Sequence, residues 1–103
     1  MDWERAGAEW PGLIVLVGLT FLNKDGSLNR REQFYGQIAS VDSADGIELD
    51  LSGSRAGESY WLPPDLRAFE PAAKGDYRLS STGELVRDPD LVSQWTIQAP
   101  LDG

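Results

Sequence analysis

The chain of 103 residues and 11.3 kDa has the size of one domain, and it is acidic: 9 Lys and Arg against 17 Asp and Glu give a net charge of −8. It contains no His and no Cys. Their absence excludes zinc fingers, Ser-His-Asp and Cys-His chemistry, iron–sulfur ligation, disulfide scaffolds and histidine pH switches. We expect a single domain over residues 1–103.

Residues 2–10 predict a short amphipathic helix that is capped by Asp2 and carries two tryptophans on one face. The first segment, residues 1–12, contains three acids and one Arg, so it lacks the positive charge of a secretory signal. The apolar stretch that follows, residues 13–22, is shorter than the roughly 20 residues that cross a bilayer as a helix. We therefore expect a cytoplasmic protein that does not contact the membrane.

Short apolar and alternating stretches separated by Asp-Gly turns predict a series of β-strands. These strands are expected over residues 13–22, 34–41, 47–51 and 59–62. Gly18, inside the first strand, predicts a bulge or a sharp bend. Pro63-Pro64 should end the fourth strand, because proline cannot donate to a ladder, and a single helical turn is expected over residues 65–69.

The remaining segment, residues 70–103, predicts a hairpin of residues 77–79 with 85–87. Asp88-Pro89-Asp90 has the character of a helix start, since Asp caps a helix and Pro fits its first position. Leu91 and Trp95 would then share one helical face. The alternative is a strand over residues 94–97.

The order of these elements resembles the small SH3-like and Sm-like barrels over residues 13–69. The resemblance rests on the order and spacing of the expected strands and turns. It implies a mostly β fold: a small antiparallel barrel with short helical turns at its N- and C-terminal ends. The domain would then consist of a helical segment (1–12), the barrel core (13–69) and a C-terminal hairpin with a short helix or strand (70–103). The loops with which Sm proteins hold RNA are not recognisable, so an RNA function does not follow.

The segment from Glu32 to Ser54 contains five acids and no Lys or Arg. Strand alternation should place Glu48 and Asp50 on one solvent-facing side, beside Asp42 and Asp45 in the neighbouring turn. Such a patch fits a docking surface for a basic protein. A solvated face that limits aggregation and a divalent-metal site are the alternatives.

Aromatic side chains near this segment are candidates for anchoring a partner. Tyr35 lies within it, and Trp61 belongs to an aromatic and proline cluster that continues through Pro64. Buried aromatics dominate the energetics of protein interfaces. Tyr35 or Trp61 would therefore be the anchor, although covering one end of the barrel is an equally simple role for Trp61.

Residues 21–32 match an EF-hand calcium loop at four positions, but the first ligand position is Phe21 and the preceding segment reads as a strand. A turn that uses Asp25-Gly26 for its positive φ explains the same residues. No cofactor or metal is expected.

Catalytic and nucleic-acid-binding roles have weak support in the sequence. No G-x-S-x-G or phosphate-binding glycine loop occurs, and we expect no enzyme activity. Arg30-Arg31 beside Phe34 and Tyr35 would suit nucleic acid, but the net charge opposes it, and no nucleic-acid partner is expected.

Three stretches resemble small bacterial proteins of unknown role, among them immunity proteins that neutralise a toxin: Tyr60–Leu66, Gly75–Leu79 and Asp88–Asp90. The resemblance implies a non-catalytic module that blocks the surface of a basic toxin. The alternatives are a structural or regulatory subunit, including a homo-oligomer paired through strand edges, and a barrel that binds a small ligand or metal.

Overall fold

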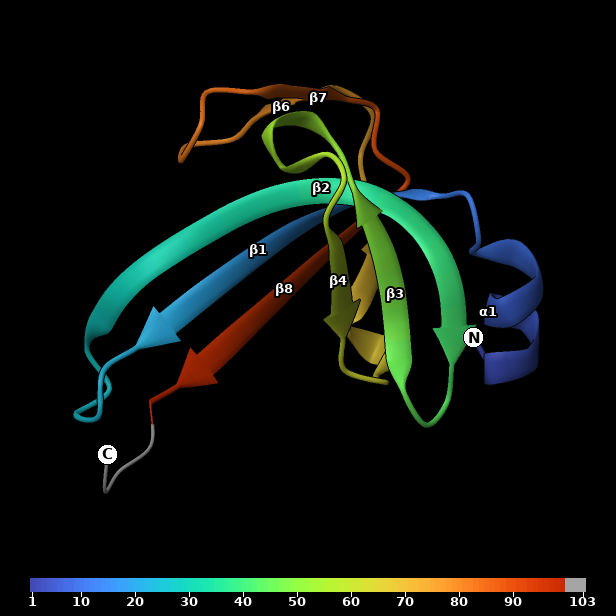
Figure 1. The fold of residues 1–103 in the computed structure, drawn as a ribbon, viewed down its shortest axis with the longest axis horizontal. Coiled ribbons are helices and arrows are strands. Elements are labelled where there is room, and N and C mark those ends of the chain that lie inside the picture. The colour runs from blue at the N-terminus through green and yellow to red at the C-terminus, as the bar shows by residue number, and fades with distance from the viewer. Residues whose placement is uncertain (100–103) are drawn as a thin grey trace.

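The computed structural model describes residues 1–99 and shows a mostly β fold with one short helix (Figure 1). A six-stranded sheet has the order β4-β3-β2-β1-β8-β5, and β6 pairs with β7 in a separate hairpin. The elements are α1 (Trp3–Glu9), β1 (Ile14–Leu22), β2 (Leu28–Asp42), β3 (Gly46–Leu51), the 3-10 turn η1 (Gly53–Arg55), β4 (Ser59–Leu62), the 3-10 turn η2 (Leu66–Ala68), β5 (Phe69–Pro71), β6 (Asp76–Arg78), β7 (Leu85–Arg87) and β8 (Leu91–Gln98). None of the helices in this part of the chain has the length and apolar character to cross a bilayer.

The expected antiparallel barrel is wrong: the sheet is open and mixed. β1 pairs with β2 in antiparallel fashion and with β8 in parallel, from Val15 opposite Leu91 to Leu22 opposite Gln98. Closing a barrel would require the two edge strands, β4 and β5, to pair with each other. Both are short, with four residues in β4 and three in β5, and Pro71 leaves the β5 edge without one backbone donor that closure would need.

The sheet folds over itself through β2, which arches above β1 and β8 and brings β3 and β4 back at a steep angle to them (Figure 1). Gly36 lies opposite Leu51 in β3, and a Cβ there would lie 2.5 Å from the backbone oxygen of Asp50. The predicted bulge or bend at Gly18 is wrong. Gly18 pairs regularly with both neighbouring strands, and a Cβ there would meet only the side chain of Gln94, at 3.7 Å.

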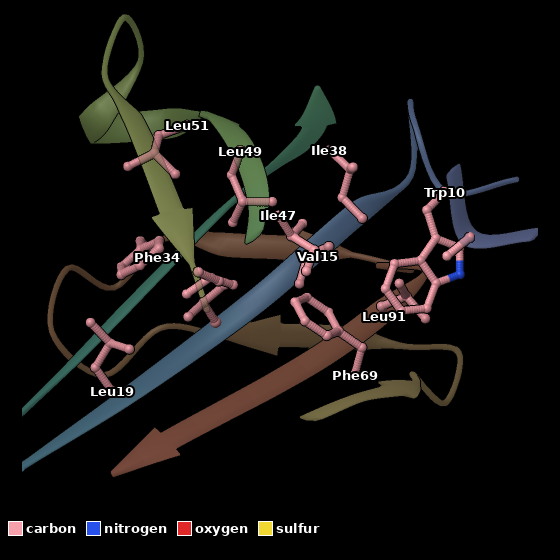
Figure 2. Close-up of a cluster of buried hydrophobic side chains, with 13 residues drawn as sticks. Trp10, Val15, Leu19, Phe34, Ile38, Ile47, Leu49, Leu51, Phe69 and Leu91 are labelled. Carbon is pink, nitrogen blue, oxygen red and sulfur yellow. The ribbon is translucent and has the colours of Figure 1, made fainter. Parts of the chain in front are cut away.

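The main core fills the concave side of this folded sheet (Figure 2). It gathers one face of β1, β2, β3 and β4 against β5, β8 and the helix α1. The buried apolar residues are Ala6, Trp10, Val15, Val17, Leu19, Phe34, Ile38, Ile47, Leu49, Leu51, Leu62, Phe69 and Leu91. The predicted N-terminal helix is confirmed: Asp2 accepts a hydrogen bond from the Arg5 N–H at 2.7 Å, and Trp10 packs on Phe69 with ring centroids 5.1 Å apart.

The hairpin of β6 and β7, which the sequence predicted, covers the convex side of the sheet (Figure 1). Two apolar residues of this hairpin region, Leu79 and Val86, are buried. The side-chain oxygen of Gln33 in β2 accepts hydrogen bonds from the Ser80 N–H at 2.6 Å and from the Ser80 hydroxyl at 2.8 Å. Glu84 accepts from the N–H and hydroxyl of Ser54 at 3.0 and 2.9 Å, so the hairpin is also tied to η1.

The helix predicted from Asp88-Pro89-Asp90 is wrong, because these residues lead directly into strand β8. Their carboxylates bind distant backbone groups and do not cap a helix. Asp88 accepts from the Gly75 N–H at 2.8 Å, and Asp90 accepts from the Ile14 N–H, also at 2.8 Å. The second bond holds the start of β8 beside the start of β1, so tertiary pairing overrides the local helix signal.

Gly36→Ala tests the close approach of β2 and β3. We expect it to lower the free energy of unfolding by about 1–3 kcal/mol, because an added methyl would force two paired backbones apart. Gly7→Ala is the matched control: a Cβ there meets nothing within 4 Å, and the change in a helix should be neutral or stabilising by up to about 1 kcal/mol. Urea denaturation of both variants measures the difference, and equal stabilities would contradict this role for Gly36.

Candidate protein-interaction surface

Within residues 1–99, no element packs over the centre of the outward side of β2, β3 and β4. The side chains there form two cross-strand rows. One row is Ser40, Glu48 and Trp61, and the other is Gln37, Asp50 and Ser59. These six residues are called the acidic face below. Their neighbours along β3 and β4 point into the core, which leaves the acidic face as the solvent side of these strands.

Because β2 contains a bulge, the residues that point outward on this face differ from those that simple alternation along the strand would place there. The register with β3 shifts between Ile38 and Ser40, so an extra residue is accommodated there. Ser40 consequently lies beside Glu48 on the acidic face, and its hydroxyl donates to the Glu48 carboxylate at 3.1 Å. Val41 turns to the opposite side and packs against the core. Strict alternation from the buried Phe34 would have placed each of these two side chains on the other face.

Trp61 is the exposed aromatic of the acidic face, with 47% of its surface accessible. It lies directly across the ladder from half-buried Glu48, and Asp50 on the next row is exposed. Neither β3 nor β4 contains a Lys or Arg. The structure therefore places three of the predicted residues together, with an indole beside two carboxylates.

The β2–β3 turn carries the other two predicted acids, and they differ in role. The Asp42 carboxylate accepts from the Asp45 and Ala44 N–H groups at 2.8 and 2.7 Å. These two bonds hold the pKa of Asp42 below its ordinary value, because they stabilise the charged form. Asp42 thus shapes the turn, whereas the exposed Asp45 adds negative charge at the end of the acidic face.

Tyr35 lies on the outward side of β2 and is half-buried. Its backbone oxygen accepts a hydrogen bond from the Ser52 N–H at 2.9 Å. The 3-10 turn η1 covers it: a Cβ at Gly53 would lie 2.9 Å from the Tyr35 ring and would collide with the Glu84 carboxylate. Gly53, at φ 65, also needs the left-handed region. Of the two predicted aromatic anchors, Trp61 is the more accessible.

Two of the arginines near this segment, Arg30 and Arg55, stand over aromatic rings. Arg55 stands over the ring of Phe34 at 4.8 Å and pairs with Glu58 at 3.0 Å. Arg30 stands over the Phe21 ring at 4.0 Å and pairs with Glu32 at 2.8 Å. Both cations are engaged with carboxylates and rings away from the acidic face.

The EF-hand-like stretch forms a β-turn between β1 and β2. Asp25 accepts from the Ser27 hydroxyl at 2.6 Å and from the Ser27 N–H at 2.9 Å, and these bonds lower the pKa of Asp25. Gly26 adopts φ 89, as the turn requires. Within residues 1–99, no three acidic side chains come together as ligands for a metal.

Sequence reasoning missed an apolar cleft of about 250 Å³ next to Trp61, which we call the β4 cleft. It lies between β4 and the concave sides of β1 and β8. Its lining consists of Leu19, Tyr60, Trp61, Leu62, Pro63, Trp95, Thr96 and Ile97. Residues 95–97 reach this position because β8 pairs in parallel with β1, a long-range pairing that local patterns do not reveal. The available signal in the sequence was the alternation of Trp95 and Ile97 with Gln94, Thr96 and Gln98, which places both apolar side chains on one side of a strand.

Comparison of the chain with protein-family models, curated proteins and solved structures finds no match.

Asp42→Ala should destabilise the protein near neutral pH, because it removes both hydrogen bonds of the turn. The folded-state pKa of Asp42 is lowered, so this stabilisation is present above the unfolded pKa and is lost as the pH falls through the folded value. The stability that Asp42→Ala loses relative to wild type should therefore become smaller as the pH falls below about 5, because the ordinary Asp pKa is about 3.9.

Asp42→Asn is the control, because its amide oxygen can accept the same two bonds without a charge. It should lie between wild type and Asp42→Ala at pH 7. Thermal unfolding over a pH series measures all three proteins, and a deficit that does not change with pH would contradict the assigned role of the carboxylate.

Proposed function

We propose that this protein is a non-catalytic binding module that docks a basic protein on its acidic face. The observation that carries the proposal is the exposed Trp61 beside Glu48 and Asp50, on strands that contain no cation. An indole and a carboxylate side by side form a two-part site for a Lys or Arg side chain. The apolar stem and the cation contact the ring, while the charged head pairs with the carboxylate.

The charge of the whole chain supports the same partner. A net charge of −8 attracts a basic protein from a distance and raises the rate of encounter. The contact would be retained by desolvation around Trp61, since large aromatics at the centre of an interface supply most of its affinity. Asp45 and Asp50 would act mainly through steering, because both are exposed.

One specific form of this proposal is an immunity protein whose partner is a basic toxin. The resemblance of Tyr60–Leu66 to that class includes Trp61, the proposed anchor. Neutralisation would follow from coverage of a basic site on the toxin and would need no chemistry from this chain. The alternative of a small ligand bound inside a barrel does not apply, because the six strands form an open sheet.

Affinity capture with the purified protein, followed by identification and titration of the purified partner, tests this proposal. We expect a basic partner whose affinity falls about tenfold or more for Glu48→Lys with Asp50→Lys, because attraction becomes repulsion. Binding of wild type should also weaken between about 0.05 and 0.5 M salt, since added salt screens exposed charges.

The matched control is Glu4→Lys with Glu70→Lys, which makes the same change in net charge at exposed positions of α1 and β5. It should reduce the affinity by less than about threefold, as expected for distant screened charges. An equal loss in both double variants would show that only net charge matters and would contradict a docking site at Glu48 and Asp50.

A further inference from the structure

The edge of the sheet beside the acidic face is open. β4 is the terminal strand and pairs only with β3 within the described residues. The Leu51 N–H donates to the Glu58 oxygen at 2.9 Å, and the ladder then pairs Asp50 with Ser59 and Glu48 with Trp61. Because hydrogen-bonded and non-hydrogen-bonded pairs alternate in an antiparallel ladder, the backbone N–H and C=O groups of Ser59 and Trp61 point away from β3.

A second open edge faces the same space. β5 pairs with β8 only at Leu91–Ser93, so the far half of β8, residues 94–98, has β1 as its one neighbour among residues 1–99. The β4 cleft lies between this half of β8 and β4. Leu19, a core residue of β1 (Figure 2), is one of the residues that line it. A strand added to β4 would therefore direct every second side chain into an apolar cleft.

Charge decides which kind of strand fits. On the outward side, the added strand would lie next to Trp61 and Ser59, with Glu48 and Asp50 one strand further. Lys or Arg at alternate positions would meet the indole and reach the carboxylates. A second copy of this chain is disfavoured by like charge, since each copy carries a net charge of −8.

We propose that β4 accepts an extended segment of the basic partner as an additional strand, with apolar side chains facing the β4 cleft and Lys or Arg side chains facing outward. This inference rests on the proposed function and specifies its mode of recognition. The main-chain bonds to Ser59 and Trp61 would set the register, and the two faces of the segment would select its sequence. Pro63-Pro64 limits the added pairing to the four residues of β4.

The first probe is a capped hexapeptide of alternating lysine and valine, titrated into the ¹⁵N-labelled protein and followed by NMR. Backbone amide shifts should concentrate at Ser59 and Trp61 and at residues lining the β4 cleft. The control peptide has the same composition in two blocks, three lysines and then three valines, so its net charge is unchanged. Equal affinity of the two peptides would overturn the proposal, because charge alone would then explain binding.

Ser59→Pro removes one outward N–H, while the pairing with β3 is retained because Ser59 faces Asp50 in a non-hydrogen-bonded pair. We expect the affinity for the alternating peptide to fall about fivefold to tenfold, as for one lost backbone hydrogen bond. Ser59→Ala keeps the N–H and should remain within about twofold of wild type. If Ser59→Pro binds as tightly as wild type, strand addition is wrong.

A peptide pair keeps the test valid if Ser59→Pro does not fold. N-methylation at alternate residues blocks one edge of the peptide, and methylation at the other set blocks the opposite edge. One of the two methylated peptides should lose binding and the other should keep it, whereas unchanged binding of both would overturn the proposal. Sedimentation of the free protein as a dimer that Ser59→Pro dissolves would assign the edge to a second copy and would overturn it as well.

Different results would contradict docking on the acidic face and strand addition at β4. A partner lost on Glu48→Lys with Asp50→Lys but unaffected by Ser59→Pro would leave the acidic face as the docking site and refute strand addition. A partner sensitive to Ser59→Pro but indifferent to the charge reversal would refute the proposed docking of a basic protein on the acidic face.

Discussion

The close approach of β3 to β2 at Gly36 allows the sheet to fold over its own core. β2 is long enough to serve two layers: one part pairs with β1, and the other carries β3 and β4 over the core. The backbone of Asp50 lies where a side chain at position 36 would begin. Glycine at this position lets the two backbones meet, and the apolar faces of both layers then bury each other.

This folding of one sheet onto itself leaves its two sides unequal. The concave side holds the main core, and the hairpin of β6 and β7 covers the convex side over β2, where Gln33 holds Ser80. β3 and β4 extend beyond that cover, so Trp61 and Asp50 stay exposed and Glu48 is half-buried. Trp61 therefore lies in water between the unpaired edge of β4 and the apolar β4 cleft, and it extends the apolar surface of that cleft.

The acidic face and the β4 cleft are adjacent because β4 contributes to both. Trp61 belongs to the outward row with Glu48, and its neighbours Tyr60 and Leu62 line the cleft from the same four-residue strand. A single extended segment could therefore be read by charge on one side and by apolar contact on the other.

Local elements with short-range signals could be predicted from the sequence: the helix capped by Asp2, the alternating strand β3, the short strand β4 before Pro63-Pro64, and the hairpin of residues 77–79 with 85–87. Glu48 and Asp50 were also placed correctly on one side of β3, because alternation has a period of two. The parallel pairing of β1 with β8, and with it the open sheet and the cleft, became visible in the folded chain alone. Asp90, which the sequence placed in the first turn of a helix, accepts a hydrogen bond from Ile14, because a contact between residues distant in the chain leaves no periodic trace in the sequence.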